Sequence, residues 1–345
     1  MSILNTNPLW NFFRLRALAT VRAGGAEIDE CDNTIRRIGS TGTSDTWYRE
    51  WITEAERLYA AACIEREAGQ NDLARRSFTR ASTYYRISYL PFFGFPVDPW
   101  LIDAFHREAE AFQCAAELSD FPLEAINISY QNSSLQAFWA RPDHLDIPRR
   151  TIICINDYDS NLHETFCVHG FTAIDRGYNC LVIDGPGQGR ELVRNISTIR
   201  PDWETVIEAV VDFLLHQPEV DPSAIVLAGW GWGAALTLRA GALENRIAAL
   251  ITGPAMSEPD PVAPIALVPG FLDIENARLS EVEDGLRAPH RYPIMYWKIM
   301  RCMVWAHGMR SFRELVQDLH RFEVEPYLSQ ITVPTLLSAH VKSPL

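Results

Sequence analysis

The chain has 345 residues, of which 47% are hydrophobic and 22% are charged, a composition ordinary for a globular protein with one large core, or one large and one small. Its net charge of −13 argues against nucleic acid or an anionic membrane surface as a partner, and no apolar run reaches the ~18 residues of a membrane span. Residues 1–20 lack the pattern of a signal peptide, and seven scattered cysteines without a CxxC pair fit a reducing, cytoplasmic setting.

Residues 1–120 predict a helical domain, because apolar side chains recur there at helical spacing. Three patterns are clear, over residues 47–69, 72–90 and 99–118. Pro91 ends the second pattern, since proline cannot continue a helix. Three helices alone cannot bury so many aromatic side chains, and we expect them to pack against the rest of the chain.

Residues 121–345 predict a second domain built on a sheet. The expected strands are a hairpin at 124–130 and 135–140, followed by 150–155, 179–183, 224–228, 247–252 and 332–338. The expected helices are 163–176, 203–216 and 232–244, with a further helical region over about 275–320. Strands that alternate with helices after an antiparallel hairpin favour a doubly wound, mostly parallel sheet.

The segment 228–234, Ala-Gly-Trp-Gly-Trp-Gly-Ala, lies between an expected strand and an expected helix. This is the setting of the G-x-S-x-G turn, or elbow, that presents the nucleophile in α/β-hydrolases. The flanking glycines are present, but Gly231 stands where the serine is expected. The sequence therefore predicts the frame of a hydrolase without its attacking hydroxyl.

Three further segments carry a more specific pattern: Gly177–Gly189 with its Asp-Gly-Pro-Gly-Gln-Gly run, Arg200–Glu204, and Phe78–Arg86. Together with the elbow, they resemble the two-domain α/β-hydrolases typified by the fungal yellowish-green heptaketide hydrolase. Bacterial dihydroxypseudooxynicotine hydrolase and the fermentation-respiration switch protein are similar. The resemblance covers about residues 45–338 and implies a helical domain that covers the active site. It also implies hydrolysis of C–C or ester-type bonds next to a ketone, often in polyketides.

In that family the elbow serine works with an acid after a late strand and a histidine near the C-terminus. Gly231 supplies no nucleophile, and no Asp or Glu follows Glu325. His340 comes too early to stand for the family histidine. We therefore expect a C-terminally truncated α/β-hydrolase fold without the triad, and whether it is an enzyme stays open.

The oxyanion side of the site is partly kept. The loop after the first parallel strand, residues 156–160, resembles the corresponding turn of the family. This resemblance implies that the backbone N–H of Trp232, just after the nucleophile position, and one from Asp157 or Tyr158 can hold a carbonyl oxygen. One interpretation is a pocket that binds and polarises a ketone without attacking it, and the other is that the fold simply retains these turns.

Trp230 and Trp232 flank the elbow and either wall an apolar pocket for a flat, polyketide-like ligand or pack as core. Either Gly231 stands there because the serine was lost and glycine accepts the strained backbone of an elbow without steric cost, or it makes room for a ligand where the serine hydroxyl would be. The Gly-rich loop around Asp184 lacks the Lys and Ser/Thr of a phosphate-binding loop and is interpreted as a turn of the family.

The histidines predict neither a metal site nor a catalyst. His163 and His169 do not share a helix face, and the others are scattered. We expect His106, His290, His307 and His320 to be surface or hydrogen-bonded core residues. No cofactor is expected.

Three functions are consistent with these features. The first is a fungal secondary-metabolite protein that assists cyclisation, isomerisation or dehydration of a ketone-bearing intermediate without a covalent step. The second is a non-catalytic partner of an active homologue, or a homodimer, paired through an open sheet edge near residues 332–338. The third is a hydrolase with another nucleophile, such as Ser160.

Overall fold

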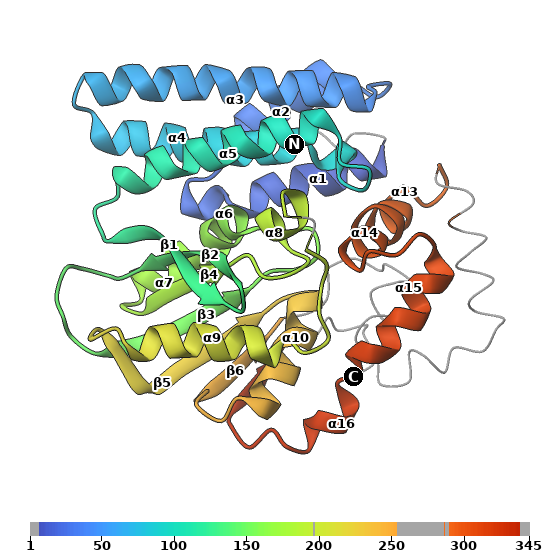
Figure 1. The fold of residues 1–345 in the computed structure, drawn as a ribbon. Helices are drawn as coiled ribbons and strands as arrows, with labels where there is room; N and C mark the ends of the chain where they lie inside the picture. Colours follow the sequence, from blue (N-terminus) through green and yellow to red (C-terminus); the bar gives the residue numbers. More distant parts are fainter. Residues whose placement is uncertain (1–6, 196, 254–285, 287–289, 339–345) are drawn as a thin grey trace. The chain divides into compact units, whose positions relative to one another are not determined.

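The computed structural model describes residues 7–195, 197–253, 286 and 290–338 (Figure 1). By its contacts the chain divides into two units, which we call the helical unit (Met1–Glu124 with His163–Thr172) and the sheet unit (Ala125–Leu162 with Ala173–Leu345). The sequence analysis drew a single boundary at residue 120, whereas the contacts group residues 163–172 with the helices. His340 and part of the expected helical region at 275–320 lie outside the described residues.

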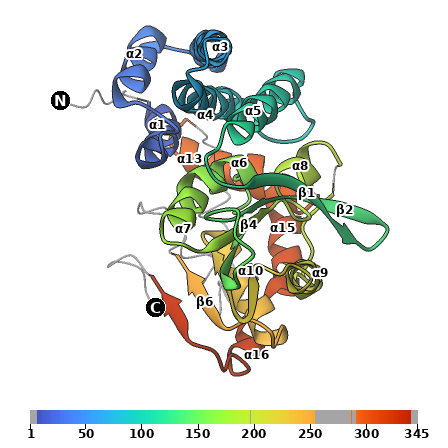
Figure 2. The ribbon, with the colours of Figure 1, turned by 90° about the vertical axis from the view of Figure 1, so that its left-hand side faces the viewer.

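The helical unit contains more helices than the three that were predicted (Figure 2). Its elements are α1 (Pro8–Ala19), η1 (Val21–Ala23), α2 (Ile28–Ile38), α3 (Ser44–Glu67), α4 (Asn71–Ser88), η2 (Leu90–Phe92) and α5 (Pro99–Glu117). The predicted patterns correspond to α3, α4 and α5. The segment that begins with α6 (Leu162–Thr165) and continues through η3 (Phe166–Gly170) into α7 (Phe171–Asp175) is mostly grouped with this unit.

Aromatic side chains form the core of the helical unit. Trp47 and Trp51 of α3 and Tyr84 of α4 are fully buried. Trp10 of α1 stacks on Trp47 with ring centroids 4.7 Å apart, so α1 supplies part of the core that the sequence analysis left unassigned. Trp47 Nε1 donates to Ile87 O at 2.9 Å, which satisfies the one polar atom of that ring.

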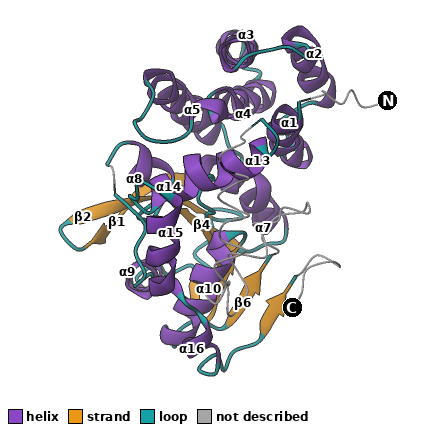
Figure 3. Cartoon of the chain, turned by 90° about the vertical axis from the view of Figure 1, so that its right-hand side faces the viewer, coloured by secondary structure: helices purple, strands orange, loops and turns teal. Residues whose placement is uncertain are grey.

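The sheet unit confirms the doubly wound, mostly parallel sheet (Figure 3). Its strands are β1 (Leu123–Tyr130), β2 (Ser133–Ala140), β3 (Arg149–Ile155), β4 (Asn179–Ile183), β5 (Val220–Gly229), β6 (Ala249–Thr252) and β7 (Thr335–Leu337). They lie in the order β1-β2-β4-β3-β5-β6-β7; β2 pairs antiparallel with β4, and β4 to β7 pair parallel along that order.

The helices of the sheet unit follow its strands. They are α8 (Gly189–Val193), α9 (Glu204–Leu215), α10 (Trp232–Leu243), α13 (Pro293–Tyr296), η5 (Trp297–Met303), α14 (Val304–Ala306), α15 (Phe312–Leu319), η6 (His320–Phe322) and α16 (Glu325–Leu328). Helices α9 and α10 pack side by side against β5 (Figures 1 and 3). Among the described residues, no helix is both long enough and apolar enough to cross a membrane.

The carboxyl ends of the central strands meet at one edge of the sheet. Ile155 of β3 is paired with Ile183 of β4 and with Gly229 of β5, and Gly229 is paired with Thr252 of β6. The loops that follow these strands therefore start at the same level. In open α/β sheets this edge is where ligands bind.

Asp184, the first residue after β4, holds the loop that follows β3. Its Oδ1 accepts from Asn156 Nδ2 and from Leu162 N, both at 2.8 Å, and its Oδ2 accepts from Arg190 N at 2.8 Å. The residue is completely buried. Asn156 and Leu162 are the two ends of the loop, so one carboxylate fixes the segment between them.

We expect Asp184→Asn to destabilise the folded chain by about 2–4 kcal/mol, because an amide NH₂ would face buried N–H donors. Urea denaturation followed by tryptophan fluorescence would measure the change. Asp146→Asn, the same substitution at an exposed position, should leave the denaturation midpoint nearly unchanged. Equal midpoints for Asp184→Asn and the wild type would contradict the role given to this carboxylate.

Candidate functional site

The elbow has the predicted strand, bend and helix. Strand β5 ends at Gly229, Trp230 and Gly231 form the bend, and Trp232 begins α10. Gly231 has φ 60° and ψ −128°, a region that favours glycine. At the flanking glycines, Gly229 and Gly233, a Cβ would collide with backbone oxygen atoms, as expected for so tight a turn.

Asp157 occupies the space that the sequence analysis assigned to a substrate oxygen. Its Oδ1 accepts from Trp232 N at 2.9 Å and from Tyr158 N at 2.8 Å. These are two of the amides that were predicted to hold a carbonyl oxygen, and in the structure they already bind a carboxylate of the chain itself. A Cβ on Gly231 would collide with the same carboxylate, at Oδ2. The carboxylate thus takes both the anion position and the nucleophile position of a hydrolase elbow.

Lys298, on the π-helical stretch η5, brings a positive charge to this carboxylate. Its Nζ lies 2.9 Å from Asp159 Oδ2 and 3.9 Å from Asp157 Oδ2. Burial raises the pKa of Asp157; Lys298 and the two amides oppose the rise, and the Asp159 carboxylate adds to it. Asp157 is therefore more basic than an exposed aspartate, while a cation lies close to its outer oxygen.

A hydrogen-bonded chain that the sequence analysis did not find adjoins this group. Tyr158 Oη lies 2.7 Å from His307 Nε2, and His307 Nδ1 lies 2.7 Å from Asp318 Oδ2. Arg321 donates to the other oxygen of Asp318 at 2.7 Å. We call Tyr158, His307 and Asp318 the relay. His307 was expected to be a surface or hydrogen-bonded core residue, and the structure places it in the core with two polar partners.

Only the fold could reveal the relay, because Tyr158 and His307 are 149 positions apart in the chain. Local sequence shows no more than the start of α15, where Ser311 accepts a capping bond from Glu314 N at 3.2 Å. That cap helps to fix the helix that carries Asp318, but no spacing in the sequence links the aspartate to His307.

The two elbow tryptophans differ in their surroundings. Trp232 is 5% exposed and its ring stacks on Tyr158, with centroids 4.9 Å apart. Its ring also meets the edges of His307 and Phe322, so Trp232 lies in the core of the site. Trp230 is half-buried, and its ring lies so close to Gly253 that a Cβ there would collide with it.

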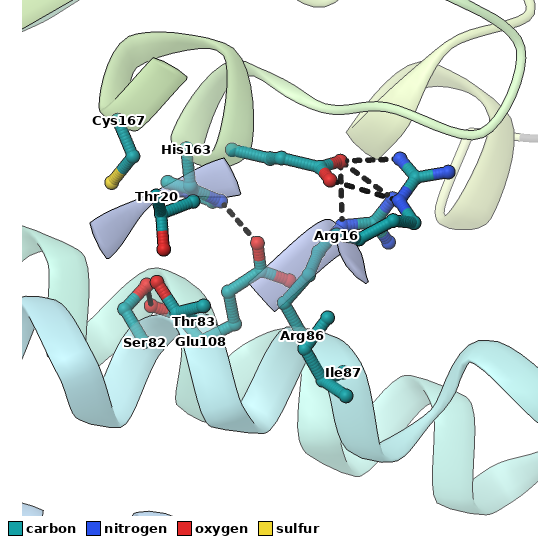
Figure 4. A pocket seen from close by; sticks show the side chains of 10 residues that line it. Arg16, Thr20, Ser82, Thr83, Arg86, Ile87, Glu108, His163 and Cys167 are labelled. Atoms are coloured by element: carbon teal, nitrogen blue, oxygen red, sulfur yellow. Dashed lines mark hydrogen bonds and ion pairs between the residues drawn. The ribbon is translucent and has the colours of Figure 1, made fainter. Parts of the chain in front are cut away.

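A second polar cluster lies within the helical unit around a small cavity (Figure 4). Arg16 and Arg86 both bind Glu164, at 2.6 and 3.1 Å, and His163 lies 3.2 Å from Glu108. The cavity has a volume of about 10 Å³, which is room for about one water molecule. It is too small for an organic substrate, and the candidate site is therefore the elbow of the sheet unit.

No group of three or more His, Cys, Asp or Glu side chains within the described part of the chain is arranged to hold a metal ion. The polar groups of the elbow are instead bound to one another and to Lys298. These side chains are able to transfer protons and to stabilise charge.

Comparison with known proteins identifies the family. The model of the alpha/beta hydrolase family matches residues 165–338, about half of the chain, and the chain belongs to this family. Hydrolase LUC6 of a Fusarium species is 27% identical over 98% of this chain and 83% of its own length. The 20-hydroxy-prefusarin hydrolase FUS2 of Gibberella moniliformis is 28% identical over 98% of this chain and 83% of its own length.

Solved structures support the same fold. The 2,6-dihydroxy-pseudo-oxynicotine hydrolase matches with a TM-score of 0.72 at 21% identity, over 93% of this chain and 80% of that one. Wild-type AbyA5 matches with a TM-score of 0.65 at 16% identity, over 97% of this chain and 80% of that one. The resemblance to fungal hydrolases and to dihydroxypseudooxynicotine hydrolase that the motifs predicted is confirmed.

We expect Gly231 and Asp157 to be energetically coupled. Gly231→Ser should destabilise the chain by about 2–3 kcal/mol, because the new side chain meets the Asp157 carboxylate and φ is positive. In an Asp157→Gly background the same substitution should be milder by at least about 1 kcal/mol. Thermal and urea denaturation of the four proteins of the cycle would give this coupling energy.

Gly69→Ser is the matched control for the backbone term, because Gly69 has φ 74° and a Cβ there would meet nothing within 4 Å. Gly69→Ser should lower the free energy of unfolding only by the smaller amount that a positive φ costs a serine. If Gly231→Ser were equally damaging with and without Asp157, the carboxylate would not be what excludes a side chain from the elbow.

Proposed function

We propose that this member of the α/β-hydrolase family binds a ketone-bearing, polyketide-type intermediate and converts it by proton transfer, without a covalent acyl intermediate. The observation that carries this proposal is the position of Asp157, a carboxylate of raised pKa at the elbow where the family places its nucleophile. The fungal relatives, one of them named for prefusarin, support the substrate class. The absence of a hydroxyl at residue 231 removes the ordinary route to acyl transfer.

Asp157 is suited to act as a general base. Oδ1 is bound by two backbone amides, which fix the carboxylate and leave Oδ2 in the space that a side chain at Gly231 would take. In the proposed step, Oδ2 removes a proton from the carbon next to the ketone, and the C–H electron pair moves into the enolate. A base works best when its pKa is close to the working pH, and burial moves the pKa of Asp157 in that direction.

Lys298 is suited to stabilise the enolate. Its ammonium group lies 3.9 Å from Asp157 Oδ2, so negative charge that develops on a neighbouring substrate oxygen would be close to it. Asp157 then returns the proton to another atom of the same molecule. Return to carbon completes an isomerisation, and return to a departing hydroxyl completes a dehydration with release of water.

Trp230 is the elbow residue best placed to contact a flat ligand, because it is half-buried whereas Trp232 is packed beneath Tyr158. We assign the wall of the ligand pocket to Trp230. Trp232 contributes its backbone N–H and the stack that orients Tyr158. The alternative of a hydrolase that uses Ser160 is less well supported, because the buried imidazole of the site, His307, is bound to Tyr158 and Asp318.

Chemical rescue tests the proposed base. The probe is a β-hydroxy ketone with a phenyl group on the hydroxyl carbon, whose dehydration product is a conjugated enone that absorbs in the near ultraviolet. We expect Asp157→Gly to lower kcat by about 10²–10⁴-fold and added formate to restore part of it, since formate fits the two freed amides. Asp146→Gly, at an exposed site, is the matched control.

Two outcomes would overturn the proposal. One is wild-type turnover by Asp157→Asn, which keeps the shape of the side chain but cannot accept the proton. The other is fluorophosphonate labelling of a serine with parallel loss of turnover, which would show covalent hydrolysis.

A second role, pairing with another chain, is favoured by strand β7. Among the described strands it is the last in the order of the sheet, and Leu336 and Leu337 are 62% and 60% exposed. An apolar edge strand offers unpaired backbone groups to another strand. We propose a second copy of this chain, or a homologue, as the partner.

Gel filtration with light scattering tests this pairing. We expect a dimer at micromolar concentration, and a monomer after Leu336→Lys with Leu337→Lys, because charge on an edge strand opposes strand addition. Leu145→Lys with Ile147→Lys, two substitutions at exposed apolar residues outside β7, is the matched control. A monomeric wild type, alone and with a homologue, would refute the pairing.

A further inference from the structure

The relay of Tyr158, His307 and Asp318 takes no part in the proton transfer described above, yet it is buried and well bonded. Its members come from three places in the sheet unit: the loop after β3, the residue after α14, and α15. Tyr158 is 6%, His307 3% and Asp318 8% exposed. Groups so deeply buried are poorly placed to touch a substrate. Their effect on the site depends on the residues to which they are bonded.

Charge and burial fix the direction of the hydrogen bonds. Burial lowers the pKa of His307, and the hydrogen bond from His307 lowers the pKa of Asp318, so a neutral imidazole faces an ionised carboxylate. Burial raises the pKa of Tyr158 well above its usual range, so the phenol keeps its proton. His307 Nδ1–H therefore donates to Asp318, and Nε2 accepts from Tyr158 O–H. A buried polar chain in which each member has a partner is rigid.

One end of the relay is joined to Asp157. The backbone N of Tyr158 is one of the two donors to Asp157 Oδ1, and the ring of Tyr158 stacks on Trp232, whose backbone N is the other donor. A shift of the Tyr158 ring would therefore disturb both amides that hold the carboxylate.

The middle member of the relay, His307, is joined to Lys298 through a helix. Elements α13, η5 and α14 run without a break from Pro293 to Ala306, and His307 follows directly, its N donating to Met303 O at 3.0 Å. Lys298 projects from this helical segment to Asp159 and Asp157. The bond between His307 and Tyr158 thus ties the helix that carries the cation to the loop that carries the base.

We propose that His307 and Asp318 are positioning residues, which act through Tyr158 to hold Asp157 on its two amides and to keep Lys298 beside it. The proposal rests on the proposed function of Asp157 as a base. The relay sets the geometry of base and cation and exchanges no proton with the substrate.

If the relay positions Asp157, breaking the relay should change the pKa of Asp157, which a purely structural role of the relay does not predict. The amides and Lys298 both lower the pKa of Asp157, so loosening them should raise it. Within the described part of the chain, the charged groups that act on Asp157 are Asp159 of the same loop and Lys298 of η5. Those that act on Tyr158 and His307 are Asp157, Asp318 of α15 and Arg321 of η6. When kcat is plotted against pH, its fall on the acidic side should therefore occur at a higher pH in variants that break the relay than in the wild type.

The experiment follows the Asp157 carboxyl by NMR in the full chain made with isotope-labelled aspartate, the signal being assigned with Asp157→Asn. His307→Ala and Tyr158→Phe should raise its pKa and lower kcat for the phenyl-substituted β-hydroxy ketone by about tenfold or more, with little change in KM. His307→Gln, which can still accept from Tyr158, should lie between His307→Ala and the wild type. His320→Gln, at a half-exposed position three residues before Glu323, is the matched control.

The outcomes separate this proposal from the one it rests on. If Asp157→Asn abolishes turnover while the folded relay variants leave both the Asp157 titration and the rate profile unchanged, positioning is refuted and the base stands. If the relay variants shift the titration but Asp157→Asn turns over normally, positioning stands and the base is refuted. Tyr158→Phe keeps the ring stack, and it provides the decisive variant if His307→Ala does not fold.

Discussion

The site depends first on a single buried carboxylate, that of Asp184. It accepts from Asn156 and Leu162 and so closes the loop after β3 at both ends. Gln188 lies in the Gly-rich loop that begins with Asp184, and its Nε2 donates to Asn156 O at 2.5 Å. Because Asp184 holds the loop at both ends, Asp157 and Tyr158 between those ends are fixed beside the elbow. The Gly-rich run therefore serves as support for the site.

Within that loop, Asp157 changes what the elbow can do. A hydrolase elbow keeps its amides free for a developing oxyanion and presents a hydroxyl beside them. Here the amides are bound to a carboxylate, and the same carboxylate fills the space of the missing side chain. The conformation of Asp157 thus requires glycine at position 231, because any side chain there would collide with the carboxylate. In the function that we propose, acid–base chemistry takes place at the position where the family performs nucleophilic attack.

The segment from Pro293 to Phe322 supplies the rest of the site. Lys298 places a cation near two carboxylates, and His307 with Asp318 forms a buried acid–imidazole pair. The pair is directed at Tyr158 and not at residue 231. An acid and a histidine are thus present near the elbow, but they come from the segment between β6 and β7, and the histidine is bonded to Tyr158 in the loop that carries Asp157.

The sequence by itself determined the family, the doubly wound sheet, the elbow and the glycine at its centre, because these depend on local periodicity and on tight turns that only glycine permits. It also indicated Asp157, Tyr158, Trp230 and Trp232 as candidates for one site, because the loop after the first parallel strand and the elbow resemble those of the family. Only the tertiary structure decided that Asp157 fills the oxyanion position, that Lys298 lies beside it, and that His307 and Asp318 are bonded in a chain to Tyr158. Those contacts join residues that are far apart in the chain, and no spacing or composition encodes which side chain will reach a given amide.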